Sequence, residues 1–254
     1  MSKSKSVQDI KKLSEEISVE DYPEFCKALE SDERKAVATI IARLHRKYEL
    51  HKKEQQRMIK IFEYEKAAIN SGYVLIAGID EAGRGPLVGP VVAGAVVLDL
   101  SVDWTGIDDS KKLSEEKRNY FYEKIVKHAI SYGVGIASHD EIDEINILNA
   151  TKLAMARALE SVNADYLLID AVKLTDIPIE QKSIIKGDSL SASIAAASII
   201  AKVTRDRMLL ELHEAYPMYD FNNNKGYGTD SHYRAIREFG IIKEHRKSFL
   251  KNIL

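Results

Sequence analysis

Four acidic residues of this 254-residue chain stand where apolar segments end. Asp80 and Glu81 follow VLIAGI, Asp170 closes YLLID, and Asp188 follows SIIKG. Ligands of open α/β sheets gather at strand ends, and a carboxylate placed there is poorly solvated unless a positive charge lies among several of them. Magnesium prefers oxygen ligands, so four acids could hold two ions. Two ions about 4 Å apart could activate water and stabilise the leaving oxygen of a phosphodiester.

A structural role is the alternative for each acid. An acid at a strand end often caps the following helix, and for Asp188, which precedes SLSASIAAAS, capping alone explains the residue as well as metal binding does. Asp170 has no evident capping role. Asp80 and Glu81 are adjacent, so their charges repel, and Arg84 is the only base in the glycine-rich stretch that follows them. The pair is therefore harder to explain as structure alone.

The glycine-rich segment 78–94, GIDEAGRGPLVGPVVAG, matches a dinucleotide-binding turn only superficially. That fingerprint needs G-x-G-x-x-G at the start of a helix, whereas Gly83 and Gly85 are followed by Pro86 and a second β-rich stretch. The chain also lacks the phosphate-binding sequence G-x-x-x-x-G-K. A dinucleotide-dependent enzyme is disfavoured. Either the glycines form a turn between two strands, or they expose backbone to an approaching sugar–phosphate chain.

Short apolar segments and helical patterns must position these residues. Strands are predicted over residues 74–80, 91–98, 132–138 and 166–170. Helices are predicted from Ser114, a plausible N-cap, to about residue 129, and over about 140–162 and 191–216. Strands in direct succession and then in alternation with helices predict an α/β fold with a mixed sheet.

Residues 1–70 differ from the rest because they contain no glycine and a single proline, Pro23. We predict a helical amino-terminal extension over 1–70 and an α/β domain over 71–254. Winding residues 32–69 as one helix produces two stripes. The apolar stripe consists of Ile40, Ile41, Leu44, Tyr48, Met58, Ile59, Phe62 and Ile69. The basic stripe consists of Arg43, Arg46, Lys53, Arg57 and Lys60. The basic stripe is either a solvated face or a surface that aids binding of phosphates.

Whole-chain composition conceals these features. The net charge is −2, from 37 basic and 39 acidic residues, which by itself argues against a nucleic-acid partner. That sum combines four acids that two divalent ions would neutralise with an extension carrying 15 Lys and Arg against 13 Asp and Glu. Because Cys26 is the single cysteine, an intrachain disulfide is excluded. We expect Cys26 to be a small buried apolar residue. Without a signal peptide or membrane segment, we expect a cytoplasmic protein.

Several motifs together resemble ribonuclease HII. They are GIDEAGRGPLVGPVVAGAVVL, DSKKLS, EIDEINI, LLIDA, KGDSLSASIAAASIIAKVTRDR and NKGYGT, and they run in family order over about residues 75–248. The resemblance implies a ribonuclease H-like fold, with a mixed β-sheet flanked by helices and a helical carboxy-terminal part. It also implies a metal-dependent endonuclease that hydrolyses RNA in RNA–DNA hybrids. The implied activity includes incision 5′ of single ribonucleotides embedded in duplex DNA, and the cleaved strand has 5′-phosphate and 3′-hydroxyl ends.

Carried over by position, the resemblance assigns roles to this chain's residues. Asp80, Glu81, Asp170 and Asp188 match the four catalytic, metal-binding carboxylates, with two Mg²⁺ or Mn²⁺ ions as cofactors. The substrate-binding matches are Gly83, Arg84, Gly85, Lys111, Arg205 and Tyr227, with Lys112, Lys202 and Lys225 as weaker candidates. The implied partners are RNA–DNA hybrid and ribonucleotide-containing duplex DNA, and we expect a monomer. Ion pairing for the bases and a loop anchor for Tyr227 remain alternatives.

Some positions depart from the family pattern. Asp230 stands where a lysine is common, and Gly240 with Ile241 replaces a Gly-Pro pair before HRKSF. Arg84 favours ribonuclease HII over ribonuclease HIII, in which a glycine-lysine-glycine turn follows the acidic pair. The first 70 residues lie outside the shared catalytic region, although some bacterial members carry such an extension. A nucleic-acid-binding protein without catalysis is the competing hypothesis, and the complete set of four acids argues against it.

Overall fold

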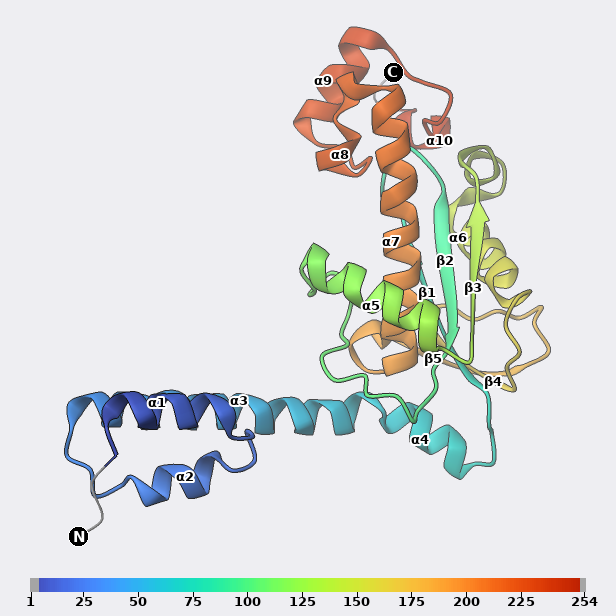
Figure 1. The fold of residues 1–254 in the computed structure, drawn as a ribbon. Coiled ribbons are helices and arrows are strands. Elements are labelled where there is room, and N and C mark those ends of the chain that lie inside the picture. Colours follow the sequence, from blue (N-terminus) through green and yellow to red (C-terminus); the bar gives the residue numbers. More distant parts are fainter. Residues whose placement is uncertain (1–4, 252–254) are drawn as a thin grey trace. The chain divides into compact units, whose positions relative to one another are not determined.

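The apolar segments form one mixed sheet in the computed structural model, which describes residues 5–251. The strands are β1 (Ile76–Ala82), β2 (Val91–Val97), β3 (Ser131–Ala137), β4 (Tyr166–Asp170) and β5 (Glu180–Ile184). Their order across the sheet is β3-β2-β1-β4-β5 (Figure 1). β1, β2 and β3 pair antiparallel, whereas β4 pairs parallel with both β1 and β5. The predicted α/β fold with a mixed sheet is confirmed.

Sequence reasoning missed β5. Its sequence, EQKSI, is polar, and only its last residue, Ile184, is buried. An edge strand with both faces largely exposed has no apolar alternation for a pattern to detect. Its backbone pairs with β4, and this pairing, rather than side-chain burial, defines it.

Helices cover both faces of the sheet. The helices are α5 (Glu115–His128), α6 (His139–Leu159) and α7 (Ala192–Ala215). On one face, Ala77 and Ile79 of β1 pack in the same core as Ala154 and Met155 of α6. The alternate residue Gly78 faces α7, where an added Cβ atom would lie 2.0 Å from the backbone of Ser193. Side chains alternate between faces along a strand, so α6 and α7 lie on opposite sides of the sheet (Figure 1).

The predicted helix starts are confirmed by their caps. The hydroxyl of Ser114 accepts from the Lys117 N–H at the start of α5, and that of Ser191 accepts from the Ile194 N–H at the start of α7. Within α6, Asn146 has φ 67° and ψ 164°, so this helix is kinked where the sequence predicted a continuous one. Within residues 5–251, no helix is long and apolar enough to cross a membrane.

A small helical subdomain completes the chain. It contains α8 (Phe221–Asn224), α9 (Asp230–Phe239) and α10 (Lys247–Leu250). The two departures from the family pattern lie at the ends of α9. Asp230 is its first residue, where a negative charge is favourable at a helix N-terminus. Gly240 follows its last residue with φ +81°, a conformation that glycine adopts without strain.

The chain divides into two compact units, Met1–Lys60 and Ile61–Leu254. This division falls ten residues before the predicted boundary, because α4 (Glu63–Asn70) packs with the sheet unit. Ala68 of α4 shares a buried cluster with Ile76, Leu168 and Ile194. The predicted extension therefore contains a piece of the C-terminal unit.

The N-terminal unit consists of α1 (Val7–Glu16), α2 (Tyr22–Ala28) and nearly all of α3 (Lys35–Ile61). Its core includes Ile10, Cys26, Val37 and Leu44, which confirms Cys26 as a buried apolar residue. The helical prediction is confirmed, but the single helix predicted over residues 32–69 is not. Phe62, with φ −98° and ψ 7°, separates α3 from α4.

The apolar stripe is confirmed only in its first half. Ile40 and Leu44 are buried, whereas Ile59 is 59% and Ile69 is 41% exposed. The reason is length: α3 has 27 residues and α1 only 10, so α3 extends beyond the helices that cover it (Figure 1). Ile69 belongs to a separate helix, in which the projected phase no longer applies.

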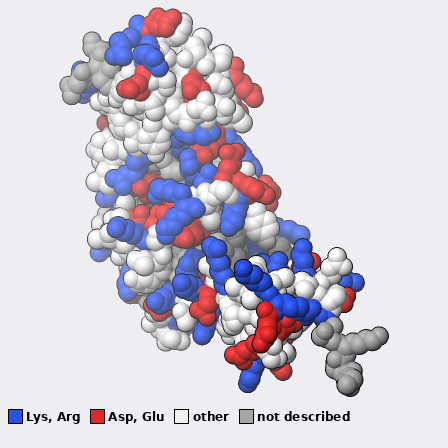
Figure 2. Space-filling view, turned by 90° about the vertical axis from the view of Figure 1, so that its left-hand side faces the viewer, with Lys and Arg blue, Asp and Glu red and all other residues white. Residues whose placement is uncertain are grey.

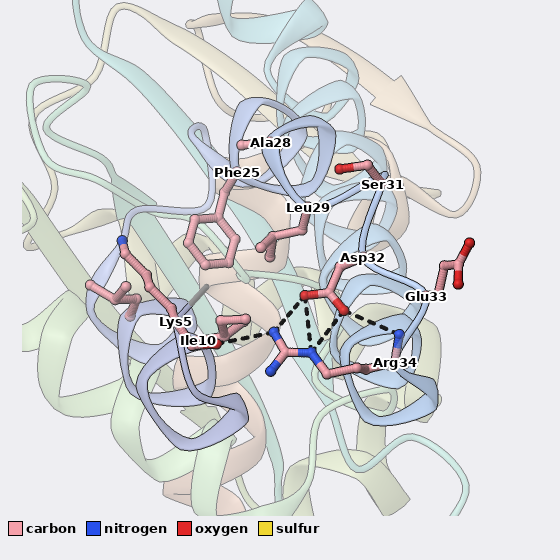
Figure 3. Close-up of a pocket in the computed structure, with 10 residues that line it drawn as sticks. Lys5, Ile10, Phe25, Ala28, Leu29, Ser31, Asp32, Glu33 and Arg34 are labelled. Atoms are coloured by element: carbon pink, nitrogen blue, oxygen red, sulfur yellow. Dashed lines mark hydrogen bonds and ion pairs between the residues drawn. The ribbon is translucent and has the colours of Figure 1, made fainter. Parts of the chain in front are cut away.

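A pocket of the N-terminal unit lies between α1, α2 and the turn before α3 (Figure 3). Arg34 points across it, donating to the carboxylate of Asp32 and to the carbonyl oxygen of Lys5 at 3.0 Å. The hydrogen bonds from Arg34 lower the pKa of Asp32 to about 2. Since this ion pair joins the turn to the chain before α1, it contributes to the structure of the unit.

Candidate active site

Sheet register brings two of the four acids together. β1 and β4 are parallel neighbours, and Ile79 pairs with Ile169. Asp80 and Asp170 are the next residues on each strand, so they occupy equivalent positions on adjacent strands. Glu81 follows Asp80 on β1, and Asp188 lies in the 3₁₀ turn η1 (Gly187–Ser189) just before α7.

Hydrogen bonds tie the turn to the strand ends. The Gly187 N–H donates to Asp170 Oδ1 at 2.7 Å, and Lys111 Nζ donates to Asp188 Oδ2 at 3.3 Å. The capping alternative for Asp188 is not supported, because the hydroxyl of Ser191 caps α7. All four acids therefore belong to one cluster that includes Lys111.

Electrostatic repulsion marks this acidic cluster. Asp80 is 3% exposed, and its burial raises its pKa well above the usual range, with the charges of Glu81 and Asp170 raising it further. Burial also raises the pKa of Glu81, although the charge of Arg84 opposes this shift. Burial likewise raises the pKa of Asp170, although the hydrogen bond from the Gly187 N–H opposes it. Glu81 Oε2 is buried and has no hydrogen-bond partner within residues 5–251. The cluster thus has more negative charge than its surroundings compensate.

Such a donor set suits a divalent cation. Within residues 5–251, no three His, Cys, Asp or Glu side chains already form a cage for a metal ion. Magnesium does not require one, since it keeps several waters and binds one or two carboxylates together with substrate phosphates. The unpartnered Glu81 oxygen and the raised pKa values indicate the place where positive charge is missing.

The glycine loop, residues 83–90, lies against two buried arginines. Arg246 donates to the carbonyl oxygens of Gly83 (2.6 Å), Arg84 (3.0 Å) and Gly89 (2.9 Å). Arg205 donates to those of Val88 (3.1 Å), Pro90 (3.1 Å) and Lys225 (3.0 Å). Burial lowers the pKa of Arg246 to about 9 and that of Arg205 to about 10, so both guanidiniums are charged at neutral pH.

The position of Arg205 corrects its predicted role. The expectation was a contact with the substrate backbone, but Arg205 is 1% exposed and its donors are engaged by carbonyl oxygens. A buried guanidinium bound in this way holds the loop and does not reach a phosphate. Gly83, with φ +95°, leaves room for it, because a Cβ atom there would lie 2.1 Å from Arg205 Nε.

Tyr227 lies beside the glycine loop. It is 48% exposed, and a Cβ atom on Gly85 would lie 3.3 Å from Tyr227 Cε1. Leu87 N–H donates to the carbonyl oxygen of Gly226, which joins the two loops. Arg84, exposed at the tip, donates to Glu81 Oε1 at 3.2 Å. The loop is thus bordered by the acidic cluster on one side and by Tyr227 on the other.

A pair of buried histidines holds the backbone of Tyr227. His245 Nδ1 accepts from the Ile242 N–H at 3.0 Å, so the hydrogen of a neutral His245 is on Nε2, which faces His232 Nε2 at 3.1 Å. His232 Nδ1 then donates to the Tyr227 carbonyl oxygen at 2.9 Å. Burial lowers the pKa of His245 to about 4, which keeps the pair neutral. Sequence reasoning missed both histidines because they are 13 positions apart, in different segments.

The remaining predicted bases have different surroundings. Lys112 donates to Ser189 of the η1 turn at 3.0 Å, so Lys111 and Lys112 both reach the segment that carries Asp188. Lys202 pairs with Asp206 at 2.7 Å, as the ion-pair alternative predicts.

In the N-terminal unit, Arg43 donates to the hydroxyl of Ser14 and Arg57 pairs with Glu54. Arg43 is nevertheless exposed, as are Arg46, Lys53 and Lys60, and the last three have no ion pair or side-chain hydrogen bond among the contacts of the described residues.

Glu65, on α4, connects the end of the predicted extension to the site. It is 1% exposed, and its Oε1 accepts from the Ser191 hydroxyl at 2.6 Å and the Ser193 N–H at 2.8 Å. These residues begin α7, directly after Asp188. Sequence reasoning missed Glu65 because its partners lie more than 120 positions away.

The molecular surface mixes charges of both signs. Figure 2 shows lysine and arginine side chains gathered around smaller groups of acidic side chains on the face that it draws. The net charge of −2 does not reveal this local distribution.

Family models match both parts of the chain. Residues 77–252 match the model described as Ribonuclease HII, and residues 6–69 match the Ribonuclease HII N-terminal domain. The chain belongs to the ribonuclease HII family. It is 50% identical to the ribonuclease HII of Clostridioides difficile (strain 630), over 98% of this chain and 99% of that protein. It is 52% identical to that of Bacillus cereus (strain Q1), over 96% and 95%.

Solved structures support the same assignment. The ribonuclease H2 of Pyrococcus horikoshii OT3 matches with a TM-score of 0.61 and 26% identity, over 71% of this chain and 97% of that chain. The RNase HII of Archaeoglobus fulgidus, solved as a PCNA:RNase HII complex, matches with a TM-score of 0.55 and 28% identity, over 68% and 94%. The protein is therefore a ribonuclease H, a hydrolase that cuts phosphodiester bonds of RNA in RNA–DNA hybrids.

Proposed function

We propose that this ribonuclease HII incises duplex DNA 5′ of single embedded ribonucleotides as well as cutting RNA–DNA hybrids. Asp80, Glu81, Asp170 and Asp188 are its catalytic residues and would hold two Mg²⁺ or Mn²⁺ ions. The observation that carries this proposal is the acidic cluster, in which buried carboxylates repel one another and Glu81 Oε2 lacks a partner. The protein would act as a monomer.

The bound ions would supply an activated water and would stabilise the leaving 3′-oxygen, giving 5′-phosphate and 3′-hydroxyl ends. The chain's own residues orient the reacting groups. Asp80 and Asp170, on adjacent parallel strands, fix one side of the site, while the η1 turn brings Asp188 to it. Lys111, whose side chain is 72% exposed, can exchange Asp188 for a phosphate oxygen.

Ribose would be distinguished from deoxyribose by the glycine loop and Tyr227. The 2′-hydroxyl is the feature that separates RNA from DNA, and exposed backbone can exchange hydrogen bonds with it. Arg84 and Gly85 are exposed between Glu81 and Tyr227. A nucleotide whose sugar packs on Tyr227 would place its 2′-hydroxyl at this loop and its phosphate toward the acids.

The N-terminal unit would aid substrate binding. Arg46, Lys53 and Lys60 expose positive charge along α3, and such charge attracts the phosphate backbone independently of sequence. This contribution raises affinity and leaves the chemical step unchanged.

One experiment tests the proposal directly. Cleavage of a duplex with one embedded ribonucleotide is compared with cleavage of a continuous RNA–DNA hybrid and of an all-DNA duplex, with Mg²⁺, with Mn²⁺ and with EDTA. We expect cleavage of the first two substrates only, only with a divalent ion, and a single incision 5′ of the ribonucleotide. Cleavage of the hybrid alone would reject the single-ribonucleotide activity, and cleavage in EDTA would reject the role of the ions.

A further inference from the structure

Arg246 directs its side-chain hydrogen bonds at the glycine loop. Its side chain is fully buried, and all three of its acceptors, the carbonyl oxygens of Gly83, Arg84 and Gly89, belong to this one loop. Its own N–H donates to the Leu87 carbonyl oxygen. Among the residues that the structure describes, no carboxylate lies within ion-pair distance of it. The charge of Arg246 is therefore directed at backbone dipoles.

Peptide geometry fixes the direction of the N–H groups that follow these carbonyl groups. In a trans peptide the C=O and N–H groups point in opposite directions, and the described chain contains no cis peptide bond. Since the carbonyl oxygens of Gly83 and Arg84 point at Arg246, the N–H groups of Arg84 and Gly85 point away from it. Both residues are exposed, and neither N–H donates to another group in the part of the chain that the structure describes.

The charge of Arg246 also strengthens these donors. A guanidinium bound to a carbonyl oxygen polarises the peptide, and the effect is larger in a buried, poorly screened environment. A second buried guanidinium, that of Arg205, lies close by and binds the next part of the same loop. The two N–H groups therefore face outward from a positively charged base, between Glu81 and Tyr227.

We propose that Arg246 is a positioning residue for ribonucleotide recognition, which fixes the loop so that the N–H groups of Arg84 and Gly85 donate to oxygens of the ribonucleotide. This inference rests on the proposed function of the loop. Asp143, on α6, holds the segment that carries Arg246, because its carboxylate accepts from the N–H groups of Lys247 and Ser248 at 2.8 and 2.9 Å. These hydrogen bonds join two segments, EIDEINI and HRKSF, of which the second carries Arg246 to the glycine loop.

Amide exchange in the unaltered protein provides the first test. NMR measures exchange with water at the Arg84 and Gly85 amides, without divalent ions, in the presence of a duplex with one ribonucleotide or of the same duplex in all-DNA form. We expect at least ten-fold slower exchange with the ribonucleotide duplex than with DNA. Equal exchange at both amides in the two complexes would overturn the proposal.

The second test replaces Arg246 with lysine, which keeps the charge but cannot reach three carbonyl oxygens. The ratio of the two dissociation constants, for DNA and for ribonucleotide duplex, is measured in EDTA. Because two hydrogen bonds to the ribonucleotide would be weakened, we expect an approximately ten-fold smaller ratio for Arg246→Lys, with unchanged affinity for DNA. Arg157→Lys is the matched control, since Arg157 also donates to a backbone carbonyl oxygen, that of Ile136, but lies on α6 away from the loop.

Each outcome is decisive. A folded Arg246→Lys variant that keeps the wild-type ratio overturns the inference. A wild-type protein without any preference for the ribonucleotide duplex refutes the proposed function instead, and so distinguishes the two failures. If Arg246→Lys does not fold, as judged by its thermal transition, the amide exchange of the unaltered protein decides.

Discussion

Two regions of this ribonuclease HII contain buried charge of a single sign, and they are satisfied very differently. The two arginines have three carbonyl acceptors each, all from the protein itself. The acids have few donors, repel one another, and leave Glu81 Oε2 without a partner. A buried charge that the protein satisfies is part of its structure, whereas one that it leaves unsatisfied is a place for a ligand.

The largest expected effect is on catalysis, through Asp80→Asn. This change would remove a proposed metal ligand, so cleavage in Mg²⁺ should fall by at least about 10³-fold. It also removes a repelling charge, so the free energy of unfolding in EDTA should rise by about 1 kcal/mol. Cleavage rates and urea unfolding measure the two effects.

Mg²⁺ sharpens the test, because it should stabilise the wild-type protein against unfolding and leave Asp80→Asn unaffected. Asp230→Asn, at the start of α9, is the control that removes an acid outside the cluster. Near-normal cleavage by Asp80→Asn would reject the assignment of the acidic cluster.

The next effect is on stability and has the opposite sign. Arg205→Met should lower the free energy of unfolding by about 3 kcal/mol, since it leaves three buried carbonyl oxygens without donors. Arg207→Met is the matched control two positions along α7, where the guanidinium is 52% exposed, and should change stability by less than about 0.5 kcal/mol. Similar losses in both variants, measured by urea unfolding, would contradict the structural role of Arg205.

The histidine pair limits the pH range in which the arginine region is stable. The folded-state pKa of His245 is about 4, below the ordinary value of 6.5, so the unfolded chain binds this proton more readily. The contribution of neutral His245 to the free energy of unfolding is complete above pH 6.5 and is lost as the pH falls toward 4. The total loss is about 3 kcal/mol. Urea unfolding at pH 7.5 and 5.0 should therefore show a larger loss for the wild type than for His245→Asn. His45→Asn, on the exposed surface of α3, should behave as the wild type does.

The smallest effect concerns the basic stripe. Replacing Arg46 and Lys53 with alanine should weaken hybrid binding a few-fold and should reduce the dependence of log K on log salt by up to about 2, with kcat unchanged. Lys12→Ala, on α1, is the control. An unchanged affinity and salt dependence would establish the stripe as a solvated face.

The acids illustrate what pattern reasoning can predict. Asp170 is the last residue of β4, and Asp80 follows the apolar residues of β1 two positions before that strand ends, so the strand pattern alone singles out both acids. The pattern could not decide whether Asp188 caps α7. That depended on Ser191 occupying the capping position, which is a matter of local conformation.

Arg205 illustrates where such reasoning fails. Its type suits phosphate binding equally well on the surface and in the interior, and the sequence does not encode which of the two applies. Burial is decided by how the helical subdomain closes over the glycine loop, and only then do its donors meet the carbonyl oxygens of Val88 and Pro90.

The sequence by itself determined the mixed sheet and singled out the four acids and the glycine loop as candidates, because each depends on residue type and local periodicity. Only the tertiary structure decided the positions of Glu65, His232, His245 and Arg246, and showed that α4 belongs to the C-terminal unit. Their partners are distant along the chain, and a hydrogen bond between distant residues exists only after the backbone has brought donor and acceptor together.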